Sequence, residues 1–278
     1  MRRALAAGAT GVAALAALAV APVPLAAGVI LVPGEERTVA SAMLRAAPGD
    51  TIVVEPGRYF GPIELKSNVR LVGLRGPSQT FLYLDAPGAT LRSLGGGPAT
   101  ALVGFTLQGT GTGVEVGRGA LQIYDCRFEP HLRTGLRCAA GGHVRLFASV
   151  FENLPLAVDA QPGADLLMMR NTLSGNSIGL RIGASMVRVY RNEFLVNAVA
   201  VEVLREGSAQ IGGTLRDANG FLGSRTVALR NHGPGAVPAA FNYWGTVDCD
   251  SVAAGVEGPV NYLPMARESR RDSVGSCP

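Results

Sequence analysis

The fold is decided by five tetrapeptides in the middle of the chain: GVEV (113–116), GLRC (135–138), AVDA (157–160), GLRI (179–182) and AVEV (200–203). Each places one charged residue among small apolar residues, which is typical of a short strand with the charge facing outward. The charged residues are Glu115, Arg137, Asp159, Arg181 and Glu202, at intervals of 22, 22, 22 and 21 residues. A fixed period of this length indicates strands stacked as turns of a solenoid, in which these alternating charges become attractive lateral neighbours.

Other positions of the repeat follow the same period. Large apolar residues form one column: Leu107, Phe128, Phe151, Leu173 and Phe194. A second column, two residues earlier, ends in Asn171 and Asn192, whose side chains can form an amide ladder. A further strand carries inward apolar pairs on either side of the outward residues Gln122, Arg145, Leu167 and Arg188. Three short strands in each turn predict an all-β fold, a three-sided parallel β-helix.

Two other repeat architectures fit less well. A leucine-rich repeat needs a Leu-rich consensus with a fixed Asn, and a helical repeat needs a 3.6-residue period that strict alternation and 37 glycines do not provide. The open first turn of a solenoid needs a cover. Residues 38–47 are therefore predicted to form an N-terminal capping helix, with Val39, Met43, Leu44 and Ala47 on its apolar side.

The first 27 residues have the pattern of an export signal. Arg2 and Arg3 precede an apolar stretch with no further charge until Glu35. An uncleaved membrane anchor is the alternative, because the apolar stretch is long enough to span a bilayer. We therefore expect a signal peptide at 1–27, one β-helix domain at 36–265 and a polar tail at 266–278, in an exported protein that is periplasmic or extracellular.

Both ends of the repeat region resemble a known family. Residues 46–74 (AAPGDTIVVEPGRYFGPIELKSNVRLVGL) and 103–116 (VGFTLQGTGTGVEV) resemble the opening coils of right-handed parallel β-helix proteins of the pectin-lyase-like superfamily. Residues 241–250 (FNYWGTVDCD) and 258–264 (GPVNYLP) are similar to the closing motif of many secreted bacterial members, with Trp244 in the large apolar column. The resemblance implies a right-handed helix, but it leaves the activity open because this fold hosts lyases, epimerases, esterases and proteins without catalysis.

Charge and cysteine content limit the partners. A net charge of +4 without a clustered basic face argues against nucleic acid, and we expect a monomer. Four cysteines in an exported chain suggest an oxidising compartment. Cys249 and Cys277 are predicted to form a disulfide that holds the polar tail. Cys126 and Cys138 face inward on one coil, either as a second bridge or as buried thiols.

The bend from Glu129 to Gly135 (EPHLRTG) is the catalytic candidate. It resembles the Asp-Pro-His-Asp motif of alginate C5-epimerases, with Glu129 in place of the first Asp and Leu132 in place of the second. His131 would transfer a proton near neutral pH, and Arg133 would neutralise the carboxylate of a uronate. Lyases of this fold often hold Ca²⁺, so Ca²⁺ would be the cofactor of a lyase, and no other cofactor is expected. The three histidines lack the spacing of metal ligands.

The function remains a choice between binding and catalysis. Four arginines are predicted to contact an anionic polysaccharide along the helix axis: Arg137, Arg145, Arg181 and Arg188. For the charges in the ladder, the favoured interpretation is structural: they form surface ion pairs that fix register. Short turns favour binding, because β-helix enzymes usually carry long loops that wall a cleft. We expect non-catalytic binding of glycan or cell-envelope polysaccharide. The alternatives are a polysaccharide lyase or uronate C5-epimerase acting through Glu129, His131 and Arg133, and a purely structural envelope protein.

Overall fold

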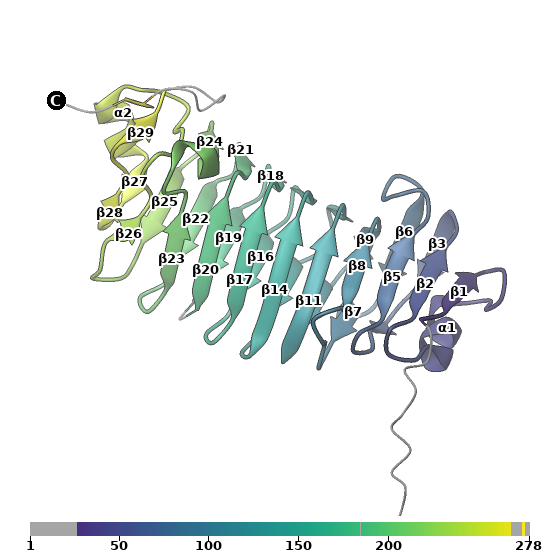
Figure 1. Ribbon diagram of the computed structural model, residues 1–278. Helices are drawn as coiled ribbons and strands as arrows, with labels where there is room; N and C mark the ends of the chain where they lie inside the picture. The colour runs from purple at the N-terminus through teal and green to yellow at the C-terminus, as the bar shows by residue number, and fades with distance from the viewer. Residues whose placement is uncertain (1–26, 184, 268–273, 276–278) are drawn as a thin grey trace, which may run out of the picture.

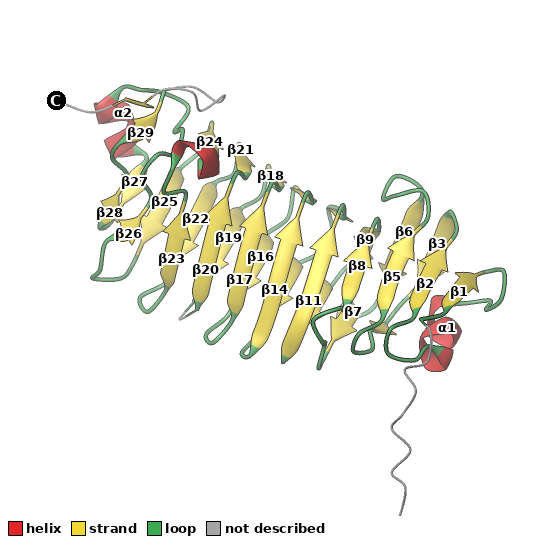
Figure 2. Ribbon diagram, viewed as in Figure 1, coloured by secondary structure: helices red, strands yellow, loops and turns green. Residues whose placement is uncertain are grey.

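The computed structural model describes residues 27–183, 185–267 and 274–275. Over these residues the chain is a parallel β-solenoid, an elongated stack of short strands with a helix near each end (Figure 1). Strands dominate and helix is confined to short segments (Figure 2). Within the three long sheets, every pairing between neighbouring strands is parallel, which confirms the predicted parallel β-helix.

Three long sheets run along the axis of the solenoid. The first contains β1 (Val29–Val32), β2 (Thr51–Val54), β5 (Arg70–Gly73), β8 (Ala101–Val103), β11 (Gly119–Tyr124), β14 (Gly142–Phe147), β17 (Asp165–Met169), β20 (Met186–Tyr190) and β23 (Ser208–Ile211). The second contains β3 (Gly57–Phe60), β6 (Thr80–Leu84), β9 (Thr106–Gly109), β12 (Arg127–Phe128), β15 (Val150–Glu152), β18 (Thr172–Ser174), β21 (Glu193–Leu195) and β24 (Gly220–Leu222). The third contains β4 (Ile63–Glu64), β7 (Ala89–Ser93), β10 (Thr112–Val116), β13 (Thr134–Cys138), β16 (Leu156–Ala160), β19 (Ile178–Ile182), β22 (Val199–Val203), β25 (Val227–Asn231) and β27 (Val256–Glu257).

The predicted register is confirmed on all three sheets. On the third sheet Arg137 lies opposite Glu115 on one side and Asp159 on the other. On the first sheet Arg145 lies between Gln122 and Leu167. The inward pairs of the first sheet are buried: Leu121, Ile123, Val144, Leu146, Leu166, Met168, Val187 and Val189. Because side chains alternate along a strand, this register sends one set of residues into the core and the other to the surface.

Amide ladders hold the bends inside the stack. The Oδ1 atom of Asn192 accepts hydrogen bonds from the backbone N–H and the side-chain amide of Asn171, both at 2.9 Å. Asn219 and Asn242 continue this ladder in the same way. A second ladder joins Asn176 to Asn197. All of these side chains are buried, so each ladder satisfies backbone donors that the bends leave without partners.

Aromatic rings fill the core along the axis. Phe128 stacks on Phe151 with ring centroids 4.2 Å apart. Phe194, Phe221 and Trp244 form a continuous stack with centroid distances of 5.0 and 4.7 Å. Trp244 thus occupies the large apolar column, as predicted, and is 7% exposed.

The N-terminal cover is the helix α1 (Val39–Arg45), as predicted. Thr38 and Ser41 form a capping box at its start. The prediction for its apolar side was partly wrong: Leu44 is 80% exposed, because Ala42 and Ala46 face the core together with Val39 and Met43. The ammonium of Lys66 donates to the carbonyls of Leu44 and Ala46 at 2.7 and 3.0 Å, which satisfies acceptors at the end of the helix.

The termini extend the solenoid beyond the repeat. β1 precedes the predicted boundary at residue 36 and pairs with β2. At the other end lie a 3₁₀ turn (Leu215–Asp217), the pair β26 (Val237–Pro238) and β28 (Val260–Asn261), the helix α2 (Cys249–Ala254), and the antiparallel pair β29 (Met265–Ala266) and β30 (Val274–Gly275). The predicted signal at 1–27 lies, except for its last residue, outside the described residues. No helix in the described part of the chain is long and apolar enough to cross a membrane.

Candidate functional site

The outward face of the third sheet carries a ladder of alternating charges that is longer than the sequence predicted. Nine residues lie in register along it: Glu64, Arg92, Glu115, Arg137, Asp159, Arg181, Glu202, Arg230 and Glu257. Four ion pairs form between neighbours. Their partners are Arg92 and Glu115, Arg137 and Asp159, Arg181 and Glu202, and Arg230 and Glu257. The third sheet therefore neutralises most of its own charge.

Glu202 shows how tightly this ladder holds its charges. Its carboxylate accepts a hydrogen bond from Arg181 Nε at 2.9 Å and lies 3.3 Å from His232 Nε2. Burial acts to raise the pKa of Glu202, but the hydrogen bonds and the positive charge of these two partners outweigh it and lower the pKa. Arg181 and Arg137, which were predicted to bind substrate, are thus already engaged by carboxylates of their own sheet.

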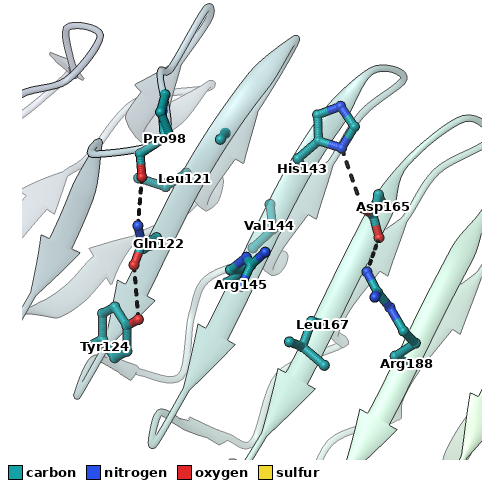
Figure 3. Close-up of a pocket in the computed structure, with 11 residues that line it drawn as sticks. Pro98, Leu121, Gln122, Tyr124, His143, Val144, Arg145, Asp165, Leu167 and Arg188 are labelled. Atoms are coloured by element: carbon teal, nitrogen blue, oxygen red, sulfur yellow. Dashed lines mark hydrogen bonds and ion pairs between the residues drawn. The ribbon is translucent and has the colours of Figure 1, made fainter.

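The first sheet presents a different outward face. A hollow of about 340 Å³ lies over β11, β14, β17 and β20 (Figure 3). A second hollow of about 650 Å³ adjoins it over β5, β8 and β11. The two share Pro98, Gln122 and Tyr124 in their linings, so they form one groove that extends along the axis from Arg70 to Arg188. We call this feature the axial groove.

Arg145 lies in the axial groove without a partner. Its side chain makes no hydrogen bond or ion pair with any residue that the structure describes, and Figure 3 draws no dashed line at it. The register explains this, because its lateral neighbours are Gln122 and Leu167, neither of which is a carboxylate. The side chain of Arg70 is likewise unpaired within the described ranges. An exposed guanidinium without a counterion is free to bind an external anion.

The remaining polar groups of the groove hold one another in place. Asp165 accepts from Arg188 Nη2 at 2.8 Å and lies 3.4 Å from His143 Nδ1 (Figure 3). The Tyr124 hydroxyl donates to Gln122 Oε1 at 2.9 Å, and the Gln122 amide donates to the Pro98 carbonyl at 2.6 Å. Asp165 is the only carboxylate among the residues that line the two hollows, whereas three arginines and one histidine line them. The groove therefore carries an excess of positive charge.

The predicted catalytic bend is divided between two hollows. Glu129 and His131 line one of about 300 Å³, together with Arg58 and Tyr83. Arg133 lines another of about 540 Å³ on the third sheet. Leu132 is fully buried, and the exposed residues on either side of it, His131 and Arg133, line different hollows. The three predicted catalytic groups do not share one site.

In the first of these hollows, Glu129 is fixed by a relay of hydrogen bonds. Its carboxylate accepts from Gln108 Nε2 at 2.6 Å, and Gln108 Oε1 accepts from Arg58 Nη2 at 2.8 Å. The Arg58 guanidinium also lies 5.3 Å from the centre of the Tyr83 ring. Burial raises the pKa of Tyr83, and nearby Asp85 acts in the same direction. The cation beside Glu129 and His131 is thus Arg58, which the sequence did not suggest.

The cysteines fall into two groups. Cys126 and Cys138 are free and buried, and burial raises the pKa of each thiol to about 12, so neither acts as a thiolate near neutral pH. Cys249 is disulfide-bonded. Cys277, its predicted partner, lies outside the described residues, so the pairing stays a prediction. No group of His, Cys, Asp and Glu side chains in the described ranges is arranged to hold a metal ion.

Comparison with known proteins adds no relative. No protein-family model, no curated protein and no solved structure matches this chain. The functional argument therefore depends on the geometry of the molecule itself.

Proposed function

We propose that this protein is an exported β-solenoid that binds an anionic glycan or cell-envelope polysaccharide along the axial groove, without catalysis. The observation that carries the proposal is the unpaired Arg145 in the groove, with Arg70 and Arg188 on the same face. Charge-assisted hydrogen bonds from arginine to a carboxylate are among the stronger polar contacts, each worth about 1.5–3 kcal/mol. Neither Ca²⁺ nor any other cofactor is needed for this function.

The shape of the groove suits a linear polymer. It extends over six strands of the first sheet, from β5 to β20, which corresponds to roughly 24 Å at the usual strand spacing. Tyr124 supplies a ring and a hydroxyl near its middle, and amphipathic aromatic side chains of this kind are frequent at binding surfaces. Repeated polar contacts along one line would allow several sugar units to bind together, which raises overall affinity.

The proposal includes membership of the pectin-lyase-like superfamily and a right-handed helix. Its support is the resemblance of residues 46–74, 103–116, 241–250 and 258–264, together with the parallel β-solenoid itself. Export is proposed from the charge and hydropathy pattern of residues 1–27 and agrees with the disulfide at Cys249. We propose a monomer that contacts the membrane only through an uncleaved N-terminal segment, if at all, and that does not bind nucleic acid.

A polysaccharide lyase or uronate C5-epimerase is the second candidate. It is favoured by one observation, the presence of Glu129, His131, Arg58 and Tyr83 in a single hollow. In that arrangement Arg58 takes the role predicted for Arg133, since Arg133 lies in the other hollow. The relay through Gln108 connects Arg58 to Glu129.

One experiment separates the two candidates. The purified protein is incubated with polygalacturonate, alginate and a neutral glycan, with and without Ca²⁺. Binding is measured by calorimetry, and turnover is followed by the ultraviolet absorbance of unsaturated products and by NMR of the polymer. We expect binding of the two uronates only, without turnover, unchanged in His131→Ala. Turnover that disappears in His131→Ala would establish the enzyme, and binding of the neutral glycan with equal affinity would contradict a groove selective for anions.

A further inference from the structure

A second concentration of positive charge lies on the third sheet, away from the axial groove. It is the hollow of about 540 Å³ that Arg133 lines, and it covers the start of β10 and β13 and part of β7. Three arginines line it, Arg92, Arg133 and Arg137, with Glu115 as the only carboxylate in its lining. Three threonines complete its polar lining: Thr110, Thr112 and Thr134. We call this feature the arginine pocket.

The charges in the arginine pocket do not balance as they do elsewhere on the charge ladder. Arg92 Nε lies 3.3 Å from Glu115 Oε2. Arg137 turns to Asp159 on the next strand instead, at a Nε to Oδ2 distance of 3.6 Å. The side chain of Arg133 has no partner among the residues that the structure describes. Arg133 lies outside the ladder register, so it adds a cation for which the sheet supplies no carboxylate.

An independent observation indicates that the pocket is incompletely satisfied. The Nε atoms of Arg92 and Arg137 are both buried, and neither makes a hydrogen bond with proper geometry. Their carboxylate neighbours are close enough for electrostatic attraction but do not satisfy these N–H groups. Buried donors without acceptors cost free energy, so the carboxylates beside Arg92 and Arg137 do not fully satisfy these two guanidinium groups.

We infer that the arginine pocket binds a tetrahedral oxyanion, the phosphate or sulfate group of an ester or of the free ion. Guanidinium groups match such anions because their planar forks donate to two oxygens at once. Arg133 supplies an unpaired guanidinium group. Arg92 and Arg137 add positive charge, and the threonines supply hydroxyl donors. The pocket is on a different sheet from the axial groove, so this inference does not rest on the proposed function.

The test is calorimetric titration with inorganic phosphate, inorganic sulfate, a monosaccharide sulfate and galacturonate. We expect the two inorganic oxyanions to bind, and Arg133→Gln to weaken that binding about tenfold. Arg170→Gln is the matched control, because Arg170 is also exposed and its side chain is unpaired within the described ranges. Tighter binding of the monosaccharide sulfate than of inorganic sulfate would identify an ester as the source, and equal binding would identify the free ion.

The pH dependence supplies a second readout. Phosphate carries less negative charge at pH 5 than at pH 7.5, as phosphate monoesters do with a second pKa of about 6, so phosphate should bind more weakly at pH 5, whereas sulfate should not change. No histidine lines the arginine pocket. Absence of phosphate and sulfate binding would overturn the inference, as would binding that Arg133→Gln leaves unchanged or galacturonate binding as tight as that of sulfate.

Discussion

The third and first sheets of this solenoid each carry outward arginines, but two of them, Arg181 and Arg145, are in opposite states. On the third sheet Arg181 lies between Asp159 and Glu202 and is bound by a carboxylate. On the first sheet Arg145 lies between Gln122 and Leu167 and has no partner in the described part of the chain. In a parallel stack, the residue one turn away decides whether an arginine stabilises the fold or remains available to a ligand.

Away from the arginine pocket, the charge ladder of the third sheet is a poor candidate for binding a polyanion along its length. A polyanion that approached the charge ladder would meet carboxylates as often as arginines, and its gain from one would be cancelled by the other. The axial groove has only Asp165 in its lining, and that carboxylate is occupied by Arg188 and His143. An anion that binds Arg145 on the first sheet would therefore not first have to break an ion pair.

The largest effect is expected from breaking the scaffold that both faces share. Asn192→Ala removes the acceptor for the backbone N–H and side-chain amide of Asn171 and leaves buried groups without partners. We expect the free energy of unfolding to fall by about 3 kcal/mol, since each such buried group costs 1–3 kcal/mol. Chemical denaturation measures this change in the free energy of unfolding. Asn261→Ala is the control, because Asn261 is exposed, and an equal loss there would show that the ladder is not the cause.

A smaller effect should follow from reversing one charge on the ladder. Arg181→Glu places three carboxylates side by side on the third sheet, and we expect a loss of about 1–2 kcal/mol in the free energy of unfolding. Arg145→Glu, the same change on the first sheet, should cost almost nothing, because no ion pair is lost. Partial restoration of stability in Arg181→Glu combined with Glu202→Arg would show that pairing is responsible, because the exchanged pair attracts but leaves like charges beside Asp159 and Arg230. Equal losses in the two single variants would contradict the difference between the faces.

The smallest effect concerns pH. The pKa of Glu202 is lowered in the folded protein, so its contribution to stability is complete above the unfolded pKa of about 4.3 and is lost as the pH falls through the folded value. Because its partners are partly exposed, we expect this contribution to stay below about 1 kcal/mol. Stability measured from pH 6 to pH 3 should fall less steeply in Glu202→Gln than in the unaltered protein. Glu64→Gln is the control on the same face, and an equal change in slope there would remove Glu202 as the cause.

The sequence predicted the solenoid because its repeat is short and regular, but it missed features where that period is interrupted. Glu64, Arg92, Arg230 and Glu257 belong to the charge ladder, yet longer turns separate most of them from their neighbours and hide their register. Asn219 was missed for the same reason, since it lies 27 residues after Asn192.

The candidate site was harder to predict than the fold. The four arginines proposed for binding form two groups, and the difference could have been found by examining which residue precedes and follows each of them by one repeat. Glu129 and His131 line a different hollow from Arg133, because Leu132 between them points into the core, and the catalytic role of the three residues stays a prediction. The role of Arg58 depends on contacts across several turns, which local sequence does not show.

Binding at the axial groove is best examined by calorimetry on two matched variants, with polygalacturonate fragments as the ligand in one buffer. Arg145→Gln is expected to bind about tenfold more weakly than the unaltered protein, because a charge-assisted hydrogen bond is lost. Arg181→Gln should bind with unchanged affinity, because Arg181 in the unaltered protein is already paired with Glu202. Equal losses in both variants, or a loss confined to Arg181→Gln, would contradict the assignment of binding to the axial groove.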